Sequence, residues 1–167
     1  MDTWTHLVGT WDGTTSRIYV DGQFIAERSG GGGNETGLYG DVTSIGSGMW
    51  TLPDFNGLID DVRIYNYALT QKQILEVMAG GSGDGQNRQA LKHPVLDLSF
   101  DEGYGDWAYD KSVHKNHGYL QHGGTGDNSA TSSMWDLNGK FGKAMEFDGT
   151  DDYVEIADSY QLDLNDD

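Results

Sequence analysis

Four aromatic residues lie in loop-like stretches where a ring is free to meet a ligand: Tyr39, Trp50, Trp107 and Trp135. Such rings stack on the apolar faces of pyranose sugars, while neighbouring Asp and Asn side chains hydrogen-bond the sugar hydroxyls. The alternative is that the rings cover the edges of a β-sandwich, because large aromatic residues are buried on average. These residues are therefore candidates for glycan binding, with edge packing as the competing interpretation.

The chain is strongly acidic, with 27 Asp and Glu residues against 10 Lys and Arg residues and a formal net charge of −17. This charge repels phosphate backbones and anionic membrane surfaces, so we expect no nucleic acid partner. The carboxylates either serve solubility or gather around hard cations such as calcium, which prefers oxygen ligands. We expect the first role over most of the surface and calcium at particular places.

The sequence supports neither thiol chemistry nor a zinc site. The chain has no cysteine, which excludes disulfides and thiolate zinc sites. His114, His117 and His122 lie close together in the sequence, but no carboxylate or cysteine accompanies them at zinc spacing. We therefore assign these histidines to loops and turns. No Ser-His-Asp or Cys-His arrangement has supporting context either.

The sequence favours a location outside the cell. No apolar run approaches the roughly 18 residues of a membrane span, so we expect no membrane insertion. The first residues lack the basic and apolar regions of a signal peptide, and we expect any such signal to lie outside this chain. Asn34-Glu35-Thr36 fits the glycosylation sequon in a Gly-rich loop. The sequon is the feature that favours an extracellular or cell-surface location.

The elements that must position these residues are mostly strands. The 25 glycines, nine tyrosines and short β-branched runs separated by turn residues are typical of an all-β fold. The Asp21-Gly22 pair predicts a hairpin over residues 17–26, because both residues tolerate the positive φ of a type I′ turn. Thr70 and Gln73 match a capping box, which predicts one short helix over residues 71–79.

Other strands are expected at residues 6–11, 42–46, 55–65, 95–100, 117–120, 143–147 and 153–156. In the strand at 55–65, alternation places Asp60 on one face with Leu58 and Val62, and Asp61 on the other. One of these two carboxylates then needs a partner. The last two strands are expected to pair with each other around the turn Asp148–Asp152.

Three stretches resemble the laminin G-like branch of the concanavalin A-like lectin and glucanase superfamily. They are WTHLVGTWDGTTSRIYVDGQFIA at 4–26, FNGLIDDVRIYNYALTQKQI at 55–74, and LDLSFDEGYGDWAYDKSVHKNHGYL at 96–120 followed by residues 139–164. The resemblance covers more than half of the chain. It implies an antiparallel β-sandwich jelly roll with one short helix.

The order of these stretches departs from the family. Residues 1–79 resemble the C-terminal half of such a domain, residues 80–93 form a Gly-rich linker, and residues 94–167 resemble the N-terminal half. The family's middle strands have no counterpart. Four accounts fit: a piece of a tandem array, a circular permutant, a natural subunit that exchanges strands, or a sandwich whose halves come from neighbouring subunits.

The resemblance also implies a structural calcium ion. Relatives hold calcium between the first and last strands, which maps onto Asp61, onto Asp101 or Glu102, and onto the carbonyl of Gly149. The alternative is that Asp101 and Glu102 only begin a turn, while Asp61 pairs with Arg63 or with solvent. Oxygen ligands of this kind suit calcium rather than zinc.

Hydrolases of the superfamily use closely spaced carboxylates on one strand, and the nearest candidate here, Glu155 with Asp158, lacks the third acid. We therefore expect a non-catalytic, calcium-stabilised extracellular module for adhesion or glycan binding. One alternative is a structural subunit that binds copies of itself to form a homo-oligomer, filament or surface layer. The other is an accessory domain of a carbohydrate-active enzyme.

Overall fold

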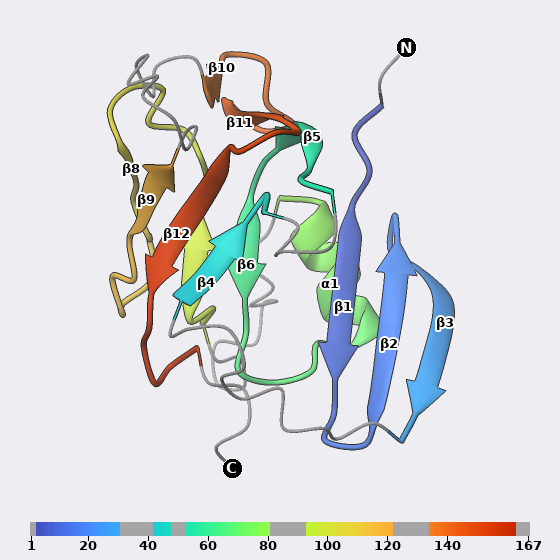
Figure 1. The fold of residues 1–167 in the computed structure, drawn as a ribbon. Helices are drawn as coiled ribbons and strands as arrows, with labels where there is room; N and C mark the ends of the chain where they lie inside the picture. Colours follow the sequence, from blue (N-terminus) through green and yellow to red (C-terminus); the bar gives the residue numbers. More distant parts are fainter. Residues whose placement is uncertain (1–2, 31–41, 48–52, 81–92, 122–133, 163–167) are drawn as a thin grey trace. The chain divides into compact units, whose positions relative to one another are not determined.

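The computed structural model describes residues 3–30, 42–47, 53–80, 93–121 and 134–162 (Figure 1). These residues form antiparallel sheets and one short helix, which confirms the all-β class. Among them, residues 3–30, 65–80 and 93–94 belong to one compact unit, and residues 42–47, 53–64, 95–121 and 134–162 belong to another. The elements in chain order are β1 (Leu7–Trp11), β2 (Thr15–Val20), β3 (Gln23–Ser29), β4 (Val42–Ile45), β5 (Asn56–Ile59), β6 (Val62–Ile64), α1 (Gln71–Met78), β7 (Leu96–Leu98), β8 (Trp107–Ala108), β9 (Gly118–Gln121), β10 (Trp135–Asp136), β11 (Ala144–Asp148) and β12 (Tyr153–Ala157).

The first unit is a three-stranded sheet in the order β1-β2-β3 with α1 packed against it (Figure 1). The β2–β3 turn has positive φ at both Asp21 (48°) and Gly22 (72°), which confirms the predicted type I′ hairpin. Tyr19 from β2 and Ile74 from α1 are buried together with Leu69. This cluster joins the helix to one face of the sheet.

Helix α1 begins as the capping box predicts. The N–H of Gln73 donates to Thr70 Oγ1 at 3.4 Å, and the N–H of Thr70 donates to Gln73 Oε1 at 2.8 Å. These two bonds satisfy backbone donors that the first helical turn leaves without partners. Ile74 is the buried residue of this short helix.

The second unit combines strands from two distant parts of the sequence. Its sheets have the orders β4-β12-β9-β8, β10-β11-β5 and β6-β7. Each early strand pairs with a late one: β4 with β12, β5 with β11 and β6 with β7. The strands β4, β5 and β6 are thus held in the unit by hydrogen bonds to β12, β11 and β7.

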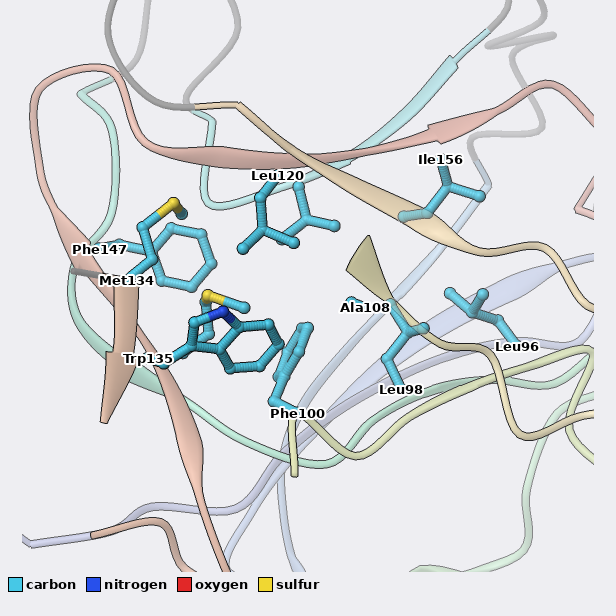
Figure 2. Close-up of a cluster of buried hydrophobic side chains, with 11 residues drawn as sticks. Leu96, Leu98, Phe100, Ala108, Leu120, Met134, Trp135, Phe147 and Ile156 are labelled. Carbon is cyan, nitrogen blue, oxygen red and sulfur yellow. The ribbon is translucent and has the colours of Figure 1, made fainter. Parts of the chain in front are cut away.

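The core of this unit lies between its sheets. Leu120 of β9 and Ile156 of β12 point toward Leu98 and Phe100 (Figure 2). The inward positions of β8, β9 and β12 alternate with outward ones, as the period of a β-strand requires. The buried members are Leu96, Leu98, Phe100, Ala108, Leu120, Met134, Trp135, Met145, Phe147, Val154 and Ile156.

The single strand expected at residues 55–65 is wrong. It breaks at Asp60-Asp61, where Asp61 has a φ of 51°, in the left-handed region that ends regular strand geometry. Before the break β5 pairs with β11, and after it β6 pairs with β7. Because the chain turns between two sheets, Leu58, Asp60 and Val62 do not follow one strand alternation.

The pairing expected between the last two strands is also wrong. β11 lies between β10 and β5, whereas β12 lies between β4 and β9. The turn between them, in which Gly149 has a φ of 80°, leads the chain from one sheet to the other. The apolar residues of both strands, such as Phe147 and Val154, still meet in the shared core. Hydrophobic alternation predicted the strands correctly but not their partners.

Candidate functional site

Asp60 is a partly buried carboxylate of the second unit. Its Oδ2 accepts a hydrogen bond from the N–H of Phe141 at 2.9 Å. Its Oδ1 is buried and has no hydrogen-bond partner among the described residues. A buried acceptor without a partner costs free energy, so this oxygen is a place where a cation or a donor would be stabilising.

Asp101 reaches the same turn. Its Oδ1 accepts from the N–H of Lys143 at 3.1 Å, and its Oδ2 accepts from Lys111 Nζ at 3.2 Å. The turn is closed by a bond from Gly139 N–H to the carbonyl of Gly142 at 3.1 Å. A Cβ at Gly142 would overlap the Asp101 carboxylate, and the φ of 79° there also favours glycine. Glycine therefore allows the turn to lie directly against the acid.

The electrostatics of the two acids differ. Burial raises the pKa of Asp60 above its ordinary value, N–H donors offset part of the rise, and the nearby charge of Asp101 adds to it. Burial also acts to raise the pKa of Asp101, but the N–H of Lys143 and the ammonium of Lys111 outweigh it, so that pKa lies below its usual range. A bound cation would therefore stabilise the ionised form of Asp60 more than that of Asp101.

The predicted ligand Asp61 has an ion-pair partner. Its Oδ1 accepts from an Arg63 terminal nitrogen at 3.1 Å, and Arg63 Nε also donates to Asp97 at 2.9 Å. Burial raises the pKa of Asp61, and Arg63 acts against that rise. The pairing with Arg63 is the alternative that the sequence left open.

Two other predicted ligands, Glu102 and Gly149, are not in this arrangement: Glu102 has a different hydrogen-bond partner, and Gly149 lies far from Asp60. Glu102 Oε1 accepts from the N–H of Tyr109 at 3.0 Å, and its Oε2 is buried with no partner among the described residues. Gly149 follows β11, whereas Asp60 follows β5, and the two strands run antiparallel. The two residues therefore lie at opposite ends of this strand pair, about 15 Å apart along it.

The structure thus brings Asp101 together with Asp60 and not with Gly149. One sequence signal pointed to Asp60, namely an acid placed among apolar neighbours that needed a partner. Near Gly149, the carboxylate oxygens of Asp148, Asp151 and Asp152 lie within 4.8 Å of one another.

An aromatic pair lies on the outward face of the four-stranded sheet. Trp107 of β8 is directly opposite Tyr119 of β9, and they are 44% and 40% exposed. Their ring centroids are 5.0 Å apart at an interplanar angle of 66°, so they form an angular step rather than a flat platform. A second step joins Tyr109, 52% exposed, to His117 at 5.2 Å.

On the same face, polar residues lie beside the Trp107–Tyr119 pair on the adjacent strands of the sheet. Tyr119 is opposite Glu155 of β12, and Glu155 is opposite Ser44 of β4. In the next row, Gln121 is opposite Tyr153. The inward neighbours Leu120, Val154 and Ile156 are buried, so alternation directs these side chains outward. The face therefore combines aromatic rings with hydrogen-bonding groups.

Trp135, another of the aromatic candidates, does not join this face. Trp135 is 9% exposed and belongs to the core (Figure 2), where its Nε1 donates to the carbonyl of Gly105 at 3.0 Å. Its ring is thus not available to a ligand, because sheet packing encloses it. Tyr39 and Trp50 lie outside the described residues.

Among the three histidines considered above, His117 stabilises a loop through its side chain. His117 Nδ1 accepts from the N–H of Asp110 at 3.0 Å, at the base of the loop that leads into β9. His114 is exposed, and its N–H donates to Ser112 Oγ at 3.1 Å. His122 lies outside the described residues.

Comparisons with known proteins agree with the β-sandwich class. In the described part of the chain, no helix has the length and apolar character that crossing a membrane requires. No curated protein and no solved structure matches the chain. A family model described as the concanavalin A-like lectin/glucanases superfamily matches residues 1–75. This segment, which contains β1 to β6 and the start of α1, is therefore similar to laminin G-like domains of that superfamily.

Proposed function

We propose that this protein is a non-catalytic, extracellular β-sandwich module that acts in adhesion by binding glycans and is stabilised by calcium. The outward face with Trp107 and Tyr119 is the observation that supports glycan binding most directly. Aromatic rings gain contact area on the apolar side of a sugar ring, and the adjacent carboxylate, amide and hydroxyl groups match its hydroxyls. Within the described residues, Glu155 is the only acid on the four strands' outward positions, which supports binding rather than two-carboxylate catalysis.

Native electrophoresis in gels that contain soluble polysaccharides tests the binding function. The panel would include hydroxyethylcellulose, xylan, mannan and dextran. We expect at least one to retard the wild-type chain and Trp107→Ala and Tyr119→Ala each to weaken that retardation about tenfold or more. Tyr160→Ala is the matched control, because Tyr160 is 77% exposed and does not lie on this sheet. Equal loss in all three variants, or retardation of none by any sugar, would contradict the proposal.

Calcium is proposed at Asp60 and Asp101. The buried Asp60 Oδ1 without a partner, the high local acidity and the all-oxygen donor set fit a hard cation. Of the residues predicted as ligands, Asp101 fits best, because it lies at the same turn as Asp60 and its ion pair with Lys111 is more exposed than the ion pair of Asp61 with Arg63. A bound calcium ion would supply positive charge that stabilises two carboxylates the fold holds near each other. It would also join residues 56–64 to residues 95–148 of the second unit.

Thermal melts with calcium and with chelator test this site. We expect calcium to raise the melting temperature of the wild-type chain and to leave Asp60→Asn unaffected. Asp158→Asn is the control, since this exposed acid lies away from the turn at 139–143. A calcium response that survives Asp60→Asn but disappears in a variant at Asp148 or Asp151 would place the ion at the acidic turn after β11 instead.

Self-assembly is the second candidate, and β3 favours it. All seven residues of β3 are exposed, including Phe24 and Ile25, and within the described residues it pairs only with β2. An open edge presents N–H and C=O groups to another chain. Light scattering after size exclusion would show oligomers that Ile25→Lys dissociates, whereas a monomer in both calcium and chelator would rule out this candidate.

A further inference from the structure

Glu155 occupies the middle of the outward row that contains the aromatic step. It has Tyr119 directly opposite on one side and Ser44 directly opposite on the other. A ligand that stacks on Trp107 or Tyr119 and extends across the sheet must pass this carboxylate. Strand spacing is about 4.8 Å, so the carboxylate lies roughly one strand from the nearer ring.

Within the described part of the chain, the carboxylate of Glu155 has no cationic partner. It makes no ion pair and no side-chain hydrogen bond there. The strand positions on this face carry Trp107, Tyr119, Gln121, Tyr153 and Ser44, none of which is basic. The net charge of the whole chain, −17, has the same sign as Glu155.

From this placement we infer that Glu155 makes the aromatic face selective for uncharged sugar chains, and that it excludes glycans carrying carboxylate or sulfate groups. This inference rests on the proposed glycan-binding function. A neutral sugar offers hydroxyl donors, which a carboxylate accepts in charge-assisted hydrogen bonds. An anionic sugar at the same position brings two like charges together near low-dielectric aromatic rings, where repulsion is stronger than in open water.

The test compares one polysaccharide in two charge states. The probes are the neutral polysaccharide that retards the wild-type chain most strongly and its carboxymethyl derivative, so the backbone stays the same. At low ionic strength we expect the wild-type chain to bind the neutral form at least about tenfold more tightly. Glu155→Gln should reduce this ratio about tenfold or more, because the affinity for the carboxymethyl form rises when the like charge is removed and the affinity for the neutral form falls when the charge-assisted hydrogen bonds are lost.

Glu146→Gln is the matched control. Glu146 is an exposed residue of β11, in a different sheet, and the substitution removes the same charge from the molecule. We expect Glu146→Gln to leave the ratio unchanged and added salt to shrink the effect of Glu155→Gln. Melting curves of both variants would confirm that each is folded.

Several results would overturn the inference. Equal effects of Glu155→Gln and Glu146→Gln would show that net charge, and not this residue, sets the preference. A wild-type chain that prefers the carboxymethyl form, or an affinity for the carboxymethyl form that does not rise in Glu155→Gln, would also contradict it. Binding that is unchanged in Trp107→Ala would move the ligand to another face. If the wild-type chain binds no polysaccharide, the proposed function fails and the inference fails with it.

Discussion

Asp110 is a buried carboxylate that organises the loop before β9. It is 1% exposed, and its oxygens accept from the N–H groups of Asp97 (2.9 Å), Ser112 (2.8 Å) and Asn116 (2.8 Å), and from Ser112 Oγ (2.7 Å). These four bonds satisfy the charge and hold both ends of the loop. The loop therefore depends on one side chain.

Replacing this residue should be costly. Asp110→Ala leaves the donors of Asp97, Ser112 and Asn116 without their acceptor, and we expect the free energy of unfolding to fall by about 3 kcal/mol or more. Urea denaturation followed by tryptophan fluorescence measures the loss. Asp158→Ala, at an exposed acid, should change stability by less than about 0.5 kcal/mol. A small effect at Asp110 would mean that water replaces the carboxylate.

Asp60 and Asp101 should respond to pH in opposite directions. The folded-state pKa of Asp60 is raised, so its contribution to stability is fully present below the ordinary pKa of 3.8 and is lost as pH rises through the raised value. The folded-state pKa of Asp101 is lowered, so its contribution is present above 3.8 and is lost as pH falls through the lowered value.

Melts in chelator between about pH 3 and pH 7 test this contrast. Relative to the wild-type chain, Asp60→Asn should gain stability as pH rises, because the amide keeps an acceptor for Phe141 N–H without a buried charge. Asp101→Asn should lose stability over the same range. Parallel trends in the two variants would show that their environments do not differ as described.

At the scale of elements, Gly118 shows how closely β9 and β12 pack. A Cβ at this position would overlap Val154 Cγ1, which is buried in the core. Gly118→Ala should therefore destabilise the protein by about 1–3 kcal/mol through overpacking. Gly9→Ala on β1 is a matched control, because a Cβ there meets no atom within 4 Å. Urea denaturation of the two variants should separate them, and similar values would argue against tight packing at Gly118.

Local elements could be predicted because their determinants are neighbours in the sequence. The Asp21-Gly22 turn and the Thr70 cap act within four residues, and both are confirmed. The break at Asp60-Asp61 and the separate sheets of β11 and β12 depend on partners far along the chain, so alternation alone could not supply them.

In the candidate site, too, features that depend on distant parts of the chain could not be predicted from the sequence. Asp101 or Glu102 was a candidate through the family resemblance, and Trp107 was one through its residue type and context; the side chains of Asp101 and Trp107 are partly exposed. The roles of Asp60 and Glu155 depend on the backbone of Phe141 and on strand register, which residue type does not report.

At the scale of the whole molecule, the net charge of −17 opposes compaction. Raising NaCl from about 10 mM to about 150 mM shortens the Debye length from about 30 Å to about 8 Å. In chelator, we expect the melting temperature to rise by about 2–4 °C for each kcal/mol of repulsion relieved. Choline chloride should act equally, since screening does not depend on the cation. A constant melting temperature would show that the carboxylates are already dispersed.

The pairing of early strands with late ones has a consequence for synthesis of the chain. Asn56 and Asp148 are 92 positions apart, and Asp60 and Phe141 are 81 positions apart. At about 5–20 residues per second, a ribosome needs several seconds to deliver the partner of β5. During that interval the hairpin β2–β3 and helix α1 have partners that are already synthesised, whereas β4, β5 and β6 pair with strands that are synthesised later. Translation speed and chaperones that shield open strands should therefore control the yield of the second unit far more than that of the first.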